Sequence, residues 1–244
     1  MFGGEDMLGK VLEELFIRIW VVIKLTLYFW IYTFVGGIIF GLGTAWKTVN
    51  ELFYLYGFEY KEITLKRGWN IYKRNFLRGN LLFSLFLSST ALLSYNLYLS
   101  VQIKGLIFLA IDFILLFALF CLFATYQYSM ILDSEYTISV PNLLKLSFIS
   151  VFSSFSSFLK TIIGSGIIIA VTWQFKGLIL FGVIGLLTVW NGTTTKQWRE
   201  ELDKQLESYE YNPDSIFKRN VTESAVAEIC GYHDWCNDDC YYYF

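Results

Sequence analysis

The sequence predicts an all-α fold, namely a polytopic helical bundle embedded in a membrane. Apolar residues make up 55% of the 244 residues, charged residues only 16%, and the mean hydropathy is +0.49. Soluble domains carry about 25% charged residues. Several apolar windows also have the length of about 20 residues that a membrane helix requires. The net charge of −2 gives no electrostatic attraction to nucleic acid.

About five transmembrane helices are expected within a transmembrane domain of residues 1–193. They lie roughly at 25–46, 79–101, 105–128, 151–173 and 177–193. The last two are halves of one apolar stretch that is too long for a single crossing and is divided at Lys176. Residues 10–24 are expected to form either an amphipathic interfacial helix or the first, water-exposed turns of the first span.

The loop between the first two spans is basic, which predicts the orientation of the chain. It holds seven basic residues against three acids, namely Lys47, Lys61, Lys66, Arg67, Lys73, Arg74 and Arg78. The other hairpin turns carry one lysine each. Because basic residues concentrate on the cytoplasmic side, we expect the N-terminus outside and the C-terminal tail in the cytoplasm.

A short element recurs with a period of 72 residues. Gln102-Ile103-Lys104-Gly105-Leu106-Ile107 returns as Gln174-Phe175-Lys176-Gly177-Leu178-Ile179. We interpret it as a parallel hairpin repeat, in which each unit has an outward helix, a tight Lys-Gly turn and an inward helix. The alternative is that short external turns share Lys and Gly without any common origin.

Three polar residues within the spans are candidates for function. Asp112 is the only acid deep in a span, and an ionisable group there is a functional candidate by default. Asn96 and Asp112 both lie eight residues from Lys104, so a hydrogen bond between them would clamp the hairpin. The alternative role for Asp112 is a proton or cation site. Lys160 is expected to snorkel towards the cytoplasmic interface.

In the segment that enters the fourth span, serines lie on one face of the expected helix and phenylalanines on another. The serine face consists of Ser147, Ser150, Ser154 and Ser157, and the other face of Phe148, Phe152, Phe155 and Phe158. Small hydroxyl residues allow membrane helices to approach closely. The serine face is therefore expected to be a packing seam, with a polar solute path as the alternative.

Residues 194–244 form an acidic tail, with eleven acids against five basic residues. A helical stripe of Trp198, Leu202, Leu206 and Tyr209 predicts a short amphipathic helix that lies against the membrane domain or a partner. The end of the tail supplies the four sulfur and nitrogen ligands of a tetrahedral zinc site, Cys230, His233, Cys236 and Cys240. The alternatives are a tail without structure of its own and, in the opposite orientation, a disulfide with a free thiol.

The order of elements from Leu12 to Trp190 resembles the YesL-like family of bacterial membrane proteins. The resemblance is carried by a Gly-rich segment, residues 36–45, and by the aromatic and basic segment Trp69-Asn70-Ile71-Tyr72-Lys73-Arg74-Asn75-Phe76. The proline usual near the end of the family's first span is missing here. The resemblance implies a multi-pass protein of a bacterial plasma membrane associated with carbohydrate uptake. It implies no catalytic or ligand site.

Three functions follow as hypotheses. The first is a non-enzymatic accessory protein, with the lipid bilayer and sugar-importer membrane subunits as partners, because no nucleophile–base pair or phosphate loop is visible. The second is a small-solute or ion transporter that uses Asp112 and the serine face. The third is a membrane sensor of metal or redox state that uses the Cys/His tail.

Overall fold

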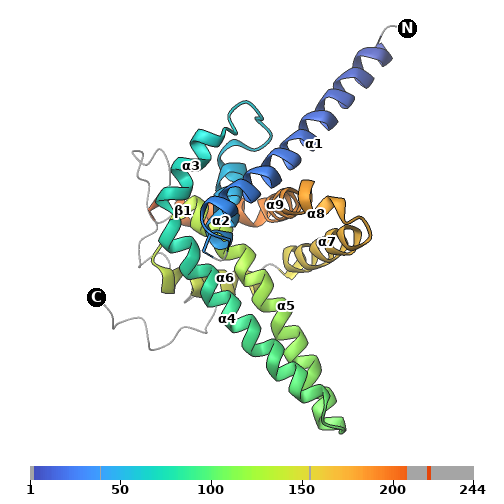
Figure 1. The fold of residues 1–244 in the computed structure, drawn as a ribbon, viewed down its shortest axis with the longest axis vertical. Helices are drawn as coiled ribbons and strands as arrows, with labels where there is room; N and C mark the ends of the chain where they lie inside the picture. Colours follow the sequence, from blue (N-terminus) through green and yellow to red (C-terminus); the bar gives the residue numbers. More distant parts are fainter. Residues whose placement is uncertain (1–2, 39, 154, 208–218, 221–244) are drawn as a thin grey trace. The chain divides into compact units, whose positions relative to one another are not determined.

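The fold is all-α apart from two very short strands (Figure 1). A computed structural model describes residues 3–38, 40–153, 155–207 and 219–220. The helices are α1 (Gly3–Val35), α2 (Leu42–Tyr56), α3 (Leu65–Arg74), α4 (Phe76–Val101), α5 (Leu106–Glu135), α6 (Val140–Ser153), α7 (Phe155–Gln174), α8 (Gly177–Phe181), α9 (Val183–Thr194) and α10 (Lys196–Glu207). Strand β1 (Tyr136–Thr137) pairs in parallel with β2 (Arg219–Asn220).

Four helices of the described residues are long and apolar enough to cross a membrane, so the protein is membrane-embedded. They are Gly9–Val35 within α1, and α4, α5 and α7. The expected span 79–101 falls within α4, and the expected span 105–128 matches α5 from Leu106 on. The expected fifth span, 177–193, is not one helix, because the chain breaks at Gly182 into α8 and α9.

The expected first span, 25–46, is wrong. Helix α1 ends at Val35, and the chain turns through residues 36–41, where Gly37 has a φ of +72° that favours glycine. Gly41 then packs against the backbone of Thr33, where a Cβ would collide. Hydropathy missed this turn because its residues are as apolar as a span. Residues 10–24 belong to α1 itself and are its first turns, not a separate interfacial helix.

The two Gln-x-Lys-Gly elements both lie at turns between helices. The first joins α4 to α5, and the second joins α7 to α8. Beyond the turns the two segments differ, since α5 has 30 residues and α8 only five.

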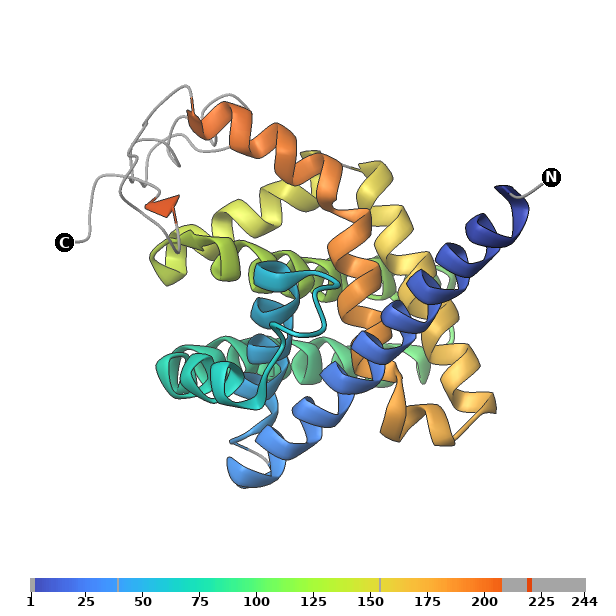
Figure 2. The same ribbon diagram turned by 90° about the horizontal axis from the view of Figure 1, so that it is seen from above.

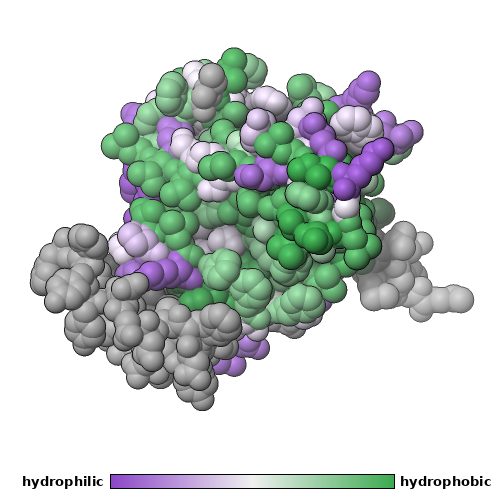
Figure 3. All heavy atoms as spheres, turned by 90° about the horizontal axis from the view of Figure 1, so that it is seen from below, coloured by the Kyte–Doolittle hydropathy of each residue, from purple (hydrophilic) through white to green (hydrophobic). Residues whose placement is uncertain are grey.

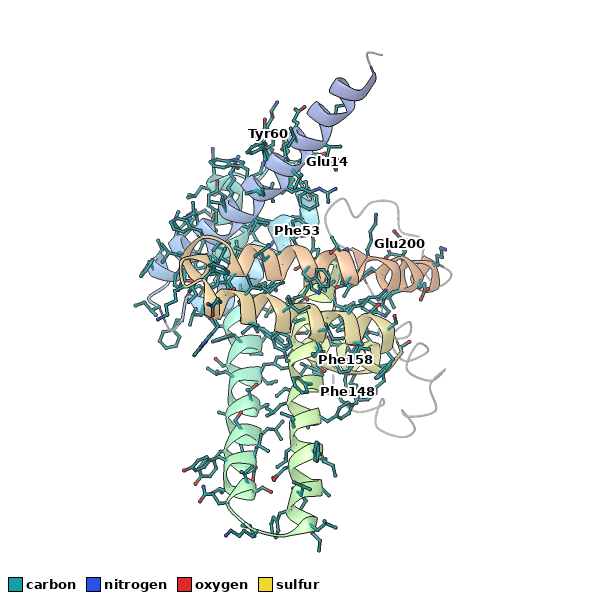
Figure 4. All side chains as sticks on the ribbon, turned by 90° about the vertical axis from the view of Figure 1, so that its right-hand side faces the viewer. Glu14, Phe53, Tyr60, Phe148, Phe158 and Glu200 are labelled. Atoms are coloured by element: carbon teal, nitrogen blue, oxygen red, sulfur yellow. The ribbon has the colours of Figure 1, made fainter. Side chains whose placement is uncertain are left out.

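The chain divides into two compact units. Unit 1 comprises Met1–Leu85 and Ile163–Gly192, and unit 2 comprises Phe86–Ile162 and Thr193–Phe244. In unit 1, α1 and α2 pack along each other, with Phe29 edge-on to Trp46 at 6.1 Å. Helix α9 crosses α1, where the Gly185 N–H donates to Thr26 Oγ1 at 3.0 Å (Figure 2). Phe53 of α2 belongs to the same core (Figure 4).

Unit 2 contains a long helical hairpin and the helices that pack near its base. The part of α4 in this unit lies beside α5, to which it is joined by the turn at residues 102–105 (Figures 1 and 4). Only 6% of the most apolar window of α5 is buried. Apolar side chains likewise cover much of the face shown in Figure 3. An apolar surface of this extent fits lipid or another membrane helix.

Helix α10 is the expected amphipathic helix, and it lies against the C-terminal end of α5. The Trp198 ring meets the Tyr128 ring edge-on at 4.9 Å, and Leu202 is also buried. Arg199 forms an ion pair with Glu135, and the Tyr136 hydroxyl donates to the Asp203 carboxylate. The Leu206 side chain and Tyr209 lie outside the described residues.

Candidate functional site

Helix α2 carries a stripe of buried polar residues in an otherwise apolar setting. The stripe consists of Thr44, Lys47, Thr48 and Glu51, each at most 1% exposed. Their spacing places them on one helical face. Ionisable side chains in an apolar helix are costly to bury, so they mark a candidate functional site by default.

Glu51 bridges this stripe to the junction of α3 and α4. Its carboxylate pairs with the Arg74 guanidinium and accepts a hydrogen bond from Asn75 Nδ2 at 2.5 Å. Asn75 is the single residue between the two helices, and its backbone N–H donates to the Ile71 carbonyl at 3.0 Å. We call Glu51, Arg74 and Asn75 the Glu51 network.

The start of α2 packs closely against the start of α4. Thr44 Oγ1 donates to the Phe76 carbonyl at 3.0 Å. A Cβ on Gly79 would lie 3.0 Å from Thr44 Cα, and one on Gly43 would collide with Phe83. Glycine at both positions therefore allows the two helix backbones to approach each other.

Three aromatic rings stack where α1 meets α3. Tyr32, Trp69 and Tyr72 have ring centroids 5.4–6.5 Å apart and nearly parallel planes. The Tyr32 hydroxyl donates to the Leu65 carbonyl at 2.9 Å, which ties α1 to the start of α3. Burial raises the pKa of the Tyr72 phenol, whose oxygen lies against Gly36.

The Glu51 network surrounds a buried carboxylate with polar partners. The Glu51 carboxylate accepts hydrogen bonds, and its partners include the Arg74 guanidinium and the Asn75 amide. Through these contacts the network ties α2 to the point at which α3 gives way to α4.

The expected hydrogen bond between Asn96 and Asp112 is not formed. Asn96 Nδ2 donates instead to the Leu92 carbonyl of its own helix at 2.8 Å. Asp112 Oδ1 is buried without a hydrogen-bond partner among the described residues. Helix α5 thus carries an unpaired carboxylate oxygen within its apolar segment. Lys160 is exposed on α7.

Ser147, Ser150 and Ser157 of the serine face are buried, and the hydroxyls of Ser147 and Ser150 bond to their own helix. Ser147 donates to the Leu143 carbonyl and Ser150 to the Leu146 carbonyl, both at 2.6 Å. Phe148, on the other face, is exposed (Figure 4). This arrangement fits the packing seam, because α6 packs against α5. Ser154 lies outside the described residues.

The proposed zinc ligands Cys230, His233, Cys236 and Cys240 also lie outside the described residues. Within the part of the chain that the structure describes, no cluster of His, Cys, Asp and Glu side chains is arranged to hold a metal ion.

Sequence reasoning missed the roles of Lys47 and Glu51 by counting both as loop charges. They are buried in α2. The available signal was the polar spacing Thr44, Lys47, Thr48, Glu51 within an apolar segment, which is typical of one helical face.

Residues 22–97 match a family described as "Protein of unknown function, DUF624". It is a family of bacterial membrane proteins that includes YesL. The matched residues contain the whole Glu51 network and both segments that carry the resemblance seen in the sequence. No curated protein and no solved structure matches the chain.

Proposed function

We propose that this chain is a non-enzymatic accessory protein of a bacterial plasma membrane that binds the membrane subunits of a carbohydrate importer. The observation that carries the proposal is the apolar hairpin of unit 2. Leu92 and Phe113 there are 65% and 67% exposed, and neighbouring residues on both helices are similar. Within a membrane, exposed apolar surfaces such as these contact lipid or pack against another membrane helix.

The use of the buried charges supports a non-catalytic role. Glu51 is engaged by Arg74 and Asn75, so its carboxylate serves to position helices. The link to carbohydrate uptake rests on the YesL-like resemblance, and is therefore an argument by analogy. The proposed topology has five crossings with α8 and α9 together as the fifth, a parallel hairpin repeat, the N-terminus outside and the tail in the cytoplasm.

The test is photo-crosslinking in native cells grown with and without complex glycans. A photoreactive phenylalanine analogue replaces Leu92 or Phe113, and a matched variant carries it at Phe16, an exposed residue of α1. Mass spectrometry after gentle detergent purification identifies the crosslinked chains. We expect importer subunits at the two hairpin positions, enriched by growth on glycans. Crosslinks to lipid alone, or the same partners from Phe16, would contradict the proposal.

A small-solute or ion transporter is the second candidate, favoured by the unpartnered Oδ1 of Asp112. In this case a proton or cation bound at Asp112 would be part of the transport cycle. The test is flux into liposomes that contain the full chain, with Asp112→Asn as the isosteric neutral variant and Asn96→Ala as the control. Flux that Asp112→Asn abolishes and Asn96→Ala preserves would favour transport. Equal flux in all three proteins would exclude a role for this carboxylate.

A further inference from the structure

Helix α3 has one buried face and an opposite face of exposed polar residues. Gly68, Ile71 and Tyr72 are buried in unit 1. Lys66, Asn70 and Lys73 are exposed, and their spacing of four and three residues aligns them on the opposite side of the helix. We call these three residues the lysine stripe.

The arginines that flank the lysine stripe are engaged within the protein, whereas its lysines are available. Arg67 pairs with Glu62, and Arg74 with Glu51. Among the described residues neither lysine of the stripe forms an ion pair, although Lys73 Nζ lies 5.2 Å from the centre of the Trp69 ring. From Glu59 to Arg78 the sequence holds six basic residues and two acids, so the segment keeps a net positive charge.

The connections of α3 place it at a membrane surface. It ends at Arg74, and the candidate span of α4 begins at Phe76. Its Tyr72 oxygen lies against Gly36, the residue after the candidate span of α1 ends. An amphipathic basic helix between two span ends, with a tryptophan beside a lysine, has the composition of the headgroup region.

We propose that the lysine stripe binds the phosphate groups of anionic phospholipids. Lys66 and Lys73 are two helical turns apart, about 10 Å by helical rise, so the two ammonium groups can engage neighbouring headgroups. The Asn70 amide between them supplies neutral hydrogen-bond donors. Attraction of a lysine to an anionic surface acts within a Debye length, about 8 Å at physiological salt, so only cations held at the surface contribute strongly.

The test measures lipid selectivity of the purified full chain in phosphatidylcholine vesicles, without any partner protein. Trace spin-labelled phosphatidylglycerol or phosphatidylcholine reports, by electron paramagnetic resonance, which lipid associates with the protein. The variant Lys66→Gln/Lys73→Gln removes the charges of the lysine stripe. The matched control, Lys104→Gln/Lys176→Gln, removes two lysines that also adjoin apolar helices but lie at the hairpin turns. Lys66→Arg/Lys73→Arg keeps the charge.

We expect the wild-type chain to prefer phosphatidylglycerol by roughly two- to five-fold, since each lysine near the surface adds a modest attraction. Lys66→Gln/Lys73→Gln should lose at least half of that preference, while the Arg variant keeps it and the hairpin control is nearly unchanged. High salt should weaken the preference of the wild type. An unchanged preference in the Gln variant, or an equal loss in the hairpin control, would overturn the proposal. Because all four lysines are exposed, each variant is expected to unfold at the wild-type temperature, which is measured alongside.

Discussion

Asn75 donates a hydrogen bond to Glu51 from the one position between α3 and α4, with 2.5 Å between Nδ2 and Oε2. Glu51 lies in the middle of a different helix, α2, and is 1% exposed. The direction in which α4 leaves α3 is therefore fixed by a buried side chain from outside the junction. Arg74, the last residue of α3, neutralises the same carboxylate.

Arg74→Ala should destabilise unit 1, because it removes the ion pair that Arg74 forms with the buried Glu51 carboxylate. Asn75 remains bonded and the Arg74 side chain is itself 52% exposed, so we expect a loss of about 2 kcal/mol rather than the larger cost of a fully buried pair. Thermal unfolding in detergent measures the change. Lys73→Ala, which removes an adjacent exposed cation, is the control and should unfold near the wild-type temperature. Equal losses in both variants would mean that Arg74 contributes only surface charge.

Gly185→Ala should disrupt the crossing of α9 over α1. A Cβ at this position would collide with the Val22 carbonyl oxygen, and backbone atoms cannot move aside as a side chain can. Overpacking of this kind costs about 1–3 kcal/mol. Gly166→Ala is the matched control on α7, where the added methyl meets nothing within 4 Å and alanine favours a helix. The midpoint temperature of thermal unfolding should be clearly lower for Gly185→Ala than for Gly166→Ala. Identical midpoints would contradict the close approach of α9 to α1.

Trp198→Ala should release α10 from the end of α5. The Trp198 ring is buried against Tyr128, and truncation of a buried tryptophan costs about 3–5 kcal/mol. Hydrogen–deuterium exchange should show faster exchange of the α10 amides, with α2 and α3 unaffected. Lys204→Ala removes an exposed residue of the same helix and should leave the exchange rates unchanged. If Trp198→Ala also leaves them unchanged, the other contacts of α10, those of Arg199, Leu202 and Asp203, hold the helix.

Asp112→Leu should stabilise the protein or leave its stability unchanged. The carboxylate has one buried oxygen without a hydrogen bond, and a charged residue in a span costs roughly 2.5–3.5 kcal/mol on insertion scales. Replacing it with an apolar residue removes that cost. The measurement is thermal unfolding in detergent, compared with Asp112→Asn, which keeps the shape of the side chain. A large loss of stability in the Leu variant would show that Asp112 has a bonding partner after all.

The helical class and the α4–α5 hairpin were predictable because their signals are local. Apolar length predicts each helix, and Lys104-Gly105 marks the turn between them. The end of α1 was not predicted, because the turn at residues 36–41 is apolar and only Gly36, Gly37 and Gly41 distinguish it from a span. Glycine in a membrane helix is common, so its presence alone does not signal a turn.

The Glu51 network could not be predicted, because its members lie 23 and 24 residues apart in sequence. Helical periodicity relates residues within one helix. It cannot relate Glu51 on α2 to Arg74 and Asn75, which lie at the end of α3 after an intervening loop. The prediction of orientation counted Glu51 and Arg74 only by the sign of their charge, as residues of a loop. A charge that is buried and paired says less about the side of the membrane on which it lies than an exposed lysine does.

The hydrogen bond from Gly185 to Thr26 joins residues that are 159 positions apart, which has a consequence for biosynthesis. At about 5–20 residues per second, a ribosome needs roughly 8–30 seconds to make that length of chain. The Thr26 hydroxyl donates meanwhile to the Val22 carbonyl of its own helix, at 2.9 Å, so its proton is already satisfied. The face of α1 that receives α9 must therefore stay covered by lipid or by the insertion machinery until Gly185 has been synthesised.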